Sequence, residues 1–114
     1  MNTAYSKRKA DVAWGAVIHA AGRCAICGTG AMLEAHHIIS RSHKATRHAV
    51  ENGILLCRIH HFDAHKNKRA FLEWLRENRP GQWRWVAANK WMTVKPDYEL
   101  AYRRLTDEIK TTTN

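Results

Sequence analysis

Residues 24–65 read CAICGTGAMLEAHHIISRSHKATRHAVENGILLCRIHHFDAH, and they hold all three cysteines and seven of the eight histidines of the chain. Two candidate ligand pairs, Cys24-x2-Cys27 and Cys57-x2-His60, have the same spacing and are separated by 29 residues. Tetrahedral zinc takes four nitrogen or sulfur ligands, and short knuckles supply two each. The stretch therefore predicts one structural zinc ion held by Cys24, Cys27, Cys57 and His60.

Other interpretations of the cysteines stay open. A C-x-x-C pair alone is also a redox motif, and Cys57 alone is also a buried thiol. However, three is an odd number, which argues against a framework made only of disulfides, and no export signal is recognisable. Metal ligation in a reducing compartment is therefore favoured. In a chain of 114 residues with a modest core, the energy of zinc binding is also energy of folding.

A second cluster of histidines is separate from the zinc ligands. His61 and His65 are four residues apart, which puts them on one face of a helix and within reach of one metal ion, whereas His60 lies on a different face from His65. Two imidazoles leave an ion under-coordinated, and the E-A-H-H cluster at 34–37 can supply a third ligand. Neighbouring strand residues point to opposite sides, which favours one ligand and one general base there. The alternative is that His36 and His37 are ordinary strand residues and that His61 and His65 face the solvent.

Hydrophobic patterns place these motifs on an α+β framework. Short strands are expected at 32–39 and 54–56, the second after the Asn52-Gly53 turn signal, and a helix is expected at 58–65. Further helices are expected at 9–21, at 68–78 with Asn67 as N-cap, and at 96–110. Residues 1–8 are expected to be frayed and 111–114 disordered, and residues 80–81 are expected to break a helix. The segment 82–91 has no clear pattern, and its tryptophans are expected to pack against the C-terminal helix.

The ordered set C-x2-C, E-x-H-H-I-I, a basic loop, E-N-G-I-L-L-C and x2-H-H-x3-H resembles the zinc-supported HNH (ββα-metal) endonucleases, including small phage-encoded members. The resemblance implies a ββα-metal core stapled by zinc, with additional flanking helices. It implies one divalent catalytic cation bound by His36, His61 and His65. It also implies that His37 is the general base and that Asn52 is the central Asn, which holds the base in place across the loop.

Two positions depart from the common family pattern, since His36 stands where many members carry Asp and His60 where many carry a fourth zinc cysteine. The implied reaction is phosphodiester hydrolysis, with products that carry a 5′-phosphate and a 3′-hydroxyl. The cation (Mg²⁺, Mn²⁺, Ni²⁺ or Zn²⁺) stabilises charge on the phosphate and on the leaving 3′ oxygen, while His37 takes a proton from water.

Charge points to a nucleic-acid partner. The formal net charge is +9, and Lys and Arg side chains release condensed counterions when they meet phosphates. We expect double-stranded DNA, with Arg41, Lys44 and Arg47 of the basic loop as phosphate contacts, although a solvated charged loop is the alternative. No apolar run is long enough for a membrane span. A cytoplasmic protein of a bacterial or phage-infected cell is expected.

The sequence thus predicts a metal-dependent DNA endonuclease that nicks or cuts both strands. The expected organisation is a helical arm at 1–22, the metal-binding core at 23–66 and a helical extension of the same domain at 67–114. A non-catalytic, zinc-stabilised nucleic-acid-binding module explains the charge and the zinc site but not the four remaining clustered histidines. A different hydrolase with a histidine-bound metal is a second alternative.

Overall fold

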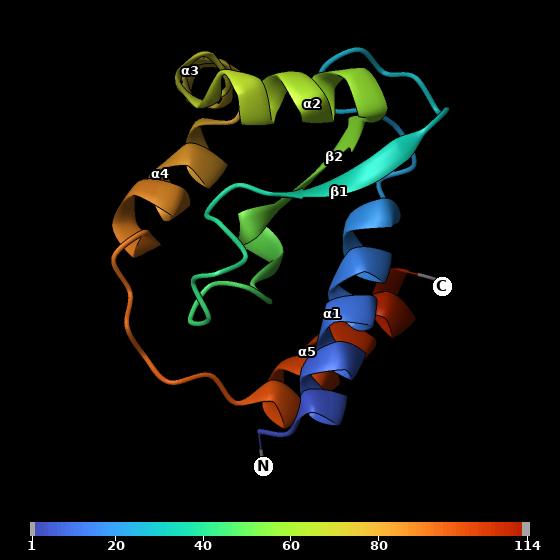
Figure 1. Cartoon of the computed structure of the whole chain (residues 1–114). Coiled ribbons are helices and arrows are strands. Elements are labelled where there is room, and N and C mark those ends of the chain that lie inside the picture. Colours follow the sequence, from blue (N-terminus) through green and yellow to red (C-terminus); the bar gives the residue numbers. More distant parts are fainter. Residues whose placement is uncertain (1, 113–114) are drawn as a thin grey trace.

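The computed structural model describes residues 2–112, and its centre is a two-stranded antiparallel sheet followed at once by a helix. Strand β1 (Leu33–His37) pairs with β2 (Gly53–Cys57), so that His36 lies opposite Ile54. Helix α2 (Arg58–Lys66) begins at the residue after β2 and crosses one side of the sheet (Figure 1). This ββα arrangement confirms the α+β fold expected from the sequence.

Alternation along β2 divides the core into two parts, one on each side of the sheet. Ile54 and Leu56 pack with Phe71 on the side of α2, where α3 (Lys68–Asn78) and α4 (Pro80–Asn89) complete the cluster. Leu55 packs with Trp14 on the other side, against α1 (Ala4–His19) and α5 (Tyr98–Thr112). Because side chains of a strand alternate between its faces, β1 can also present neighbouring residues to different surroundings.

Helix α1 corrects the expectation of a frayed N-terminus, because it begins at Ala4 rather than at residue 9. Its start is fixed by a capping box in which Thr3 accepts from the Ser6 backbone N–H and the Ser6 hydroxyl accepts from that of Thr3. The helix then runs to His19, which is exposed, and Gly22 follows in the left-handed region with φ of 78°. Glycine is the residue that adopts this conformation without strain.

Of the helices after α2, α3 and α4 pack against each other, whereas α5 lies apart from them along α1 (Figure 1). Asn67 caps α3 by accepting from the Ala70 backbone N–H, as the sequence predicts. The segment without a clear pattern is α4, which Pro80 opens at its first turn, where a missing N–H costs nothing.

The tryptophan expectation was wrong in the choice of partner. Trp83 and Trp85 pack against the α2 side of the core, Trp91 is 80% exposed, and α5 lies along α1 instead. Residues 111 and 112 belong to α5 rather than being disordered, and the rest of that expectation, residues 113–114, lies outside the described residues. Within the described residues, no helix is both long and apolar enough to cross a bilayer.

Candidate metal centres and active site

The four expected zinc ligands come together at the start of α2. Cys24 and Cys27 lie in a turn after α1, and Cys57 and His60 lie at the junction of β2 and α2. All four ligand atoms lie within 4.8 Å of one another, and Cys27 Sγ is 3.9 Å from Cys57 Sγ. Two sulfurs bound to one tetrahedral zinc ion lie about 3.8 Å apart. The cluster therefore has the donor set and spacing of a closed Cys3His zinc site.

Backbone dipoles favour a thiolate in this cluster. Burial alone would raise the pKa of the Cys24 thiol, but hydrogen bonds from the backbone at Cys27, Cys57 and Ile26 outweigh it and lower the pKa to about 6. The thiolate is the form that binds metal. The fold thus favours a charged sulfur at this position.

The second cluster gathers three imidazoles from two elements. His36 comes from β1, while His61 and His65 come from successive turns of α2, and their ligand atoms lie within 4.8 Å of one another. The Glu34 carboxylate lies 2.8 Å from Nδ1 of His61 and can only accept, so Nδ1 carries the hydrogen and the lone pair is on Nε2. That Nε2 atom is 3.1 Å from Nε2 of His65. Nitrogen ligands of a single zinc-sized ion lie about 3 Å apart.

His36 is the deepest member of this cluster. It is 5% exposed, and its buried Nδ1 has no hydrogen-bond partner among the described residues. Burial lowers the pKa of His36 to about 3, with further contributions from the neighbouring charges of His61 and His65. A neutral imidazole with an unsatisfied buried nitrogen fits a metal ligand, because an unpaired buried polar atom is otherwise costly. The donor set at His36, His61 and His65 thus suits a divalent cation.

His37 faces a different environment from His36, although the two are adjacent on β1. Its ring stacks on Trp14 of α1, with centroids 3.8 Å apart and planes at 10°. Its Nε2 lies 3.0 Å from the Arg47 carbonyl, which can only accept, so Nε2–H donates and Nδ1 keeps a free lone pair. Burial lowers the pKa of His37, and the hydrogen bond to Arg47 opposes that shift only in part. His37 is therefore a neutral imidazole with one nitrogen available as a base.

Asn52 ties the loop after β1 to the start of β2. Its side chain is fully buried, accepts from the Ile39 backbone N–H and donates to the carbonyls of Ile39 and Thr46. These bonds close the loop that follows the base. The central Asn of the sequence pattern therefore lies where it holds backbone rather than touching a substrate.

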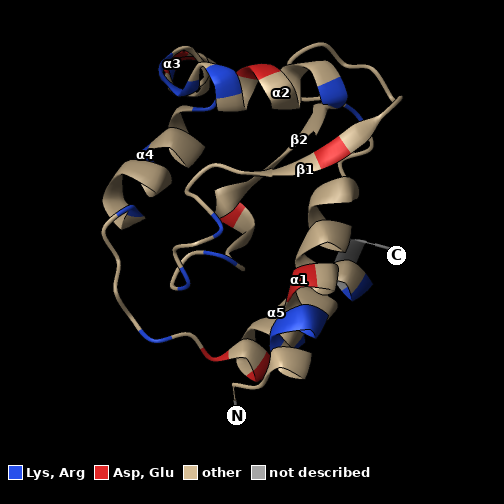
Figure 2. Cartoon of the chain, in the orientation of Figure 1, with Lys and Arg blue, Asp and Glu red and all other residues tan. Residues whose placement is uncertain are grey.

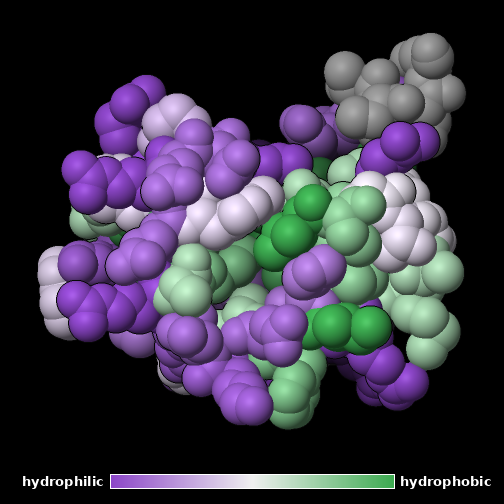
Figure 3. Space-filling model, turned by 90° about the horizontal axis from the view of Figure 1, so that it is seen from above, coloured by the Kyte–Doolittle hydropathy of each residue, from purple (hydrophilic) through white to green (hydrophobic). Residues whose placement is uncertain are grey.

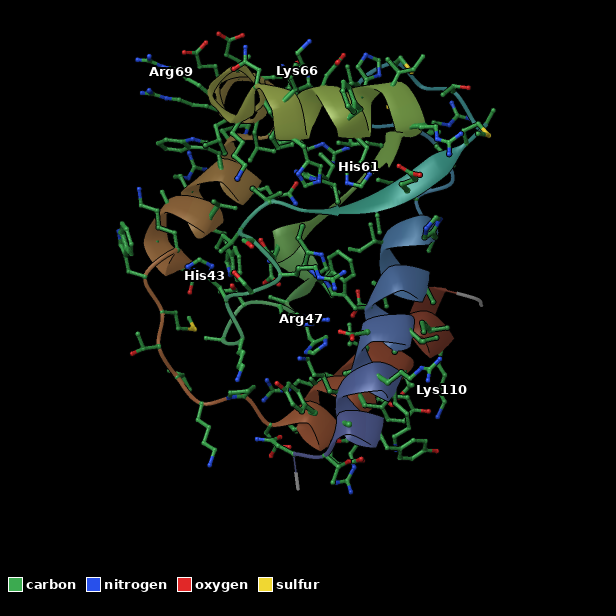
Figure 4. The ribbon with its side chains drawn as sticks, in the orientation of Figure 1. His43, Arg47, His61, Lys66, Arg69 and Lys110 are labelled. Atoms are coloured by element: carbon green, nitrogen blue, oxygen red, sulfur yellow. The ribbon has the colours of Figure 1, made fainter. Side chains whose placement is uncertain are left out.

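The basic loop residues have different surroundings from one another. Arg41 is exposed and lines a cavity of about 450 Å³ together with the three clustered imidazoles, His37 and Lys68. Lys44 is also exposed but lies beside Lys95 and Pro96, away from that cavity. Arg47 lies between its loop and α1 (Figure 4), and there it makes a bidentate pair with Asp11 at 2.8 and 3.0 Å.

Asp11 and Trp14 are the functional candidates that the sequence did not reveal. Both lie on α1, and their partners Arg47, Ala49 and His37 lie more than 20 residues away along the chain. In the sequence Trp14 is one of five tryptophans, and Asp11 is one of ten acidic residues. No local pattern marks either as a neighbour of the base.

Residues 24–66 match the family model described as HNH endonuclease. This segment belongs to the HNH endonuclease family. The match covers the knuckle, which is the turn that holds Cys24 and Cys27, and also both strands and α2. It leaves out α1 and the helices after α2. Neither a curated protein nor a solved structure matches the chain. The match supports a nuclease-type enzyme, and HNH nucleases as a family act on DNA.

Proposed function

We propose that the chain is a metal-dependent DNA endonuclease that hydrolyses phosphodiester bonds. One observation carries the proposal: a single open cavity is lined by His36, His61 and His65 and also by the neutral imidazole of His37. A divalent cation bound by the three histidines would polarise a phosphate oxygen and stabilise the leaving 3′ oxygen. Several divalent ions suit imidazole ligands, so Mg²⁺, Mn²⁺, Ni²⁺ and Zn²⁺ are all candidates.

His37 supplies the base in this proposal. Its Nε2 is engaged by the Arg47 carbonyl, so the free Nδ1 is the atom that takes a proton from the attacking water. The lowered pKa keeps the ring unprotonated near neutral pH, which a base requires. Glu34 orients His61 through the 2.8 Å contact at Nδ1, which leaves Nε2 turned toward His65.

Charge around the cavity supports a polyanionic substrate. Arg41 lies at the cavity on the loop side and Lys68 on the α3 side, so both can contact phosphates next to the cleaved bond. Lys66 and Arg69 point outward from α2 and α3 (Figure 4), and Lys and Arg recur along the helices and the connecting loops (Figure 2). Hydrophilic side chains gather over the α3 side of the upper face (Figure 3). We propose double-stranded DNA as the substrate, with Lys44 as a more distant phosphate contact.

Arg47 has another role in this proposal. Its guanidinium is held by Asp11 and by the Arg41 carbonyl, at 3.1 Å in the second case. It therefore orders the loop rather than binding phosphate. The division into an arm at 1–22, a core at 23–66 and an extension at 67–114, the cytoplasmic location and the phage-type origin stay predictions from the sequence.

The test is cleavage of supercoiled plasmid by the wild-type protein and by His37→Ala, with magnesium, manganese or nickel. Loss of a general base typically costs about 100- to 10 000-fold in rate, so His37→Ala should lose cleavage while it keeps zinc and DNA binding. His43→Ala is the matched control, because His43 is exposed in the same loop and does not line the cavity. Unchanged cleavage by His37→Ala would remove His37 from the mechanism.

The non-catalytic alternative gives a different result in the same assay. A zinc-loaded wild-type protein that binds DNA but nicks no plasmid with any of these metals would be a binding module. The clustered imidazoles of the cavity favour the enzyme, because a module that only binds DNA has no need of three imidazoles within 4.8 Å of one another.

A further inference from the structure

Helix α1 lies outside the residues that match the HNH family, yet it reaches the candidate base by two routes. Trp14 and Asp11 are three residues apart, which puts them on the same side of the helix. Trp14 contacts the His37 ring directly. Asp11 acts through Arg47, whose carbonyl accepts the His37 hydrogen bond.

The contact of Trp14 is suited to fixing the plane of the imidazole. The two rings are nearly parallel at 10° with centroids 3.8 Å apart, and Trp14 is itself buried at 4% exposure. The indole Nε1–H donates to the Ala49 carbonyl at 2.9 Å, so the stacking ring is also bonded to the loop that follows the base. A side chain that is packed and hydrogen-bonded in this way holds its neighbour in one orientation.

The ion pair between Asp11 and Arg47 is suited to fixing the carbonyl that accepts the hydrogen bond of His37. The carboxylate binds the Arg47 guanidinium through both oxygens and also lies 2.7 Å from Nε2 of His48. Bidentate carboxylate–guanidinium pairs are directional as well as strong. The Arg47 backbone, and hence the carbonyl that accepts from His37, is thereby tied to α1.

We propose that α1 completes the candidate active site, with Trp14 and Asp11 as positioning residues that hold the free Nδ1 of His37 toward the cavity. The proposal rests on the proposed nuclease function. Stacking restrains the ring plane and the hydrogen bond restrains its rotation, so the base is held ready before substrate binds. The segment that matches the family would then be incomplete as a catalyst without the helix that precedes it.

The experiment compares single-turnover cleavage rates and DNA affinity for three replacements in α1. Trp14→Leu keeps an apolar side chain but loses stacking and the indole donor, and we expect the rate to fall by about 10- to 100-fold with DNA affinity and zinc content unchanged. Trp14→Phe keeps an aromatic ring against His37 and should recover most of the rate. Ile18→Ala is the matched control, because Ile18 belongs to the same core cluster and packs against Gly53 but has no aromatic ring to stack on His37. It should melt earlier but cleave at nearly the wild-type rate.

Two outcomes would overturn the proposal: Trp14→Leu cleaving as fast as the wild type, or losing no more rate than Ile18→Ala. If Trp14→Leu does not fold, Asp11→Ala replaces it, since Asp11 is partly exposed and its loss should still lower the rate by up to about tenfold. An Asp11→Ala protein with an unchanged rate would then count against the inference.

A spectroscopic measurement separates this inference from the nuclease assignment. The ring current of Trp14 should shift the His37 imidazole protons upfield in the wild-type NMR spectrum, where they are identified by their absence from His37→Ala. A His37 signal at the ordinary position would overturn the stacking, whatever the activity. An upfield signal in a protein that cuts no DNA would instead count against the proposed function alone.

Discussion

The zinc cluster and the imidazole cluster share one short helix but differ in how they are enclosed. His60 and His61 are adjacent in α2, yet His60 faces two knuckle cysteines and His61 faces β1. The first cluster offers four ligands, enough to close a tetrahedral site. The second offers three and opens onto a cavity, which leaves coordination positions for water or substrate. One helix can thus carry a stabilising ion and a reactive ion because its successive residues point in different directions.

The surroundings of the two clusters differ as well. The zinc ligands are drawn from both ends of the matched segment, so the ion would fasten the knuckle to the start of α2. The imidazole cluster instead shares its cavity with His37, whose hydrogen-bond partner Arg47 lies on the loop after β1. Asn52 and α1 supply hydrogen bonds that hold this loop. We therefore expect damage to the first cluster to affect the whole fold and damage to the second to affect the reaction.

The largest effect should come from removing the zinc site. Cys24→Ala deletes one of four ligands, and structural zinc contributes about 10 kcal/mol or more of binding energy. Since a small domain has about 5–15 kcal/mol of total stability, the variant should lose its zinc and its cooperative melting transition. Metal analysis and thermal melting followed by circular dichroism measure both. A Cys24→Ala protein with one zinc ion per chain and wild-type melting would show that this cluster is not structural.

The next effect should appear in the imidazole cluster and leave the fold intact. His61→Ala and His65→Ala each remove one ligand of the candidate catalytic cation, and we expect cleavage to fall by about 100-fold or more. Melting temperature and the zinc ion of the Cys3His cluster should be retained, because neither side chain belongs to that set.

The control for His61→Ala and His65→Ala is replacement of His60, the neighbour of His61 in α2. His60→Ala should lose zinc and stability together, although it is next to His61 in the sequence. If His61→Ala also lost the zinc ion of the Cys3His cluster together with its stability, the two clusters would be one unit and the contrast between them would fail.

The sequence was most informative where spacing alone decides geometry. Matched x2 pairs at Cys24 and Cys57 identified a set of residues that the fold brings together, and the i, i+4 relation of His61 and His65 put both on one side of α2. The α+β class followed from the hydrophobic patterns of the short strands and helices. In each case the relevant contact is local or is set by strand and helix periodicity.

The sequence was least informative where side chains from distant segments meet. Arg47 reads as a phosphate contact in a basic loop, and only the folded chain shows that Asp11 occupies its guanidinium. Trp14 carries no sequence prediction of its own, and nothing local shows that its ring lies against His37. The start of α1 was missed because its capping box uses Ser6 rather than the more familiar Glu or Gln.

The smallest effect should be a pH dependence of stability caused by His48, which lies in the loop between β1 and β2. Burial lowers the pKa of His48, and this outweighs the hydrogen bond and charge of Asp11, which raise it. Arg47 and Lys7 add further lowering, and the Tyr98 ring packs edge-on at 5.5 Å. A group whose pKa is lower in the folded chain contributes stability that is present above its unfolded pKa, about 6.5. That contribution is lost as the pH falls through the lower folded value.

His48→Gln isolates this contribution, because an amide can still donate to the Asp11 carboxylate but does not titrate. Between pH 7 and pH 5 the zinc-loaded wild type should lose more melting temperature than zinc-loaded His48→Gln. Other histidines with lowered pKa values, such as His36 and His65, are common to both proteins and cancel in the difference. Parallel pH profiles would mean that protonation does not loosen the loop at His48. A steeper wild-type profile would show that protonation of His48, beside Asp11 and Tyr98, destabilises the fold as the pH falls.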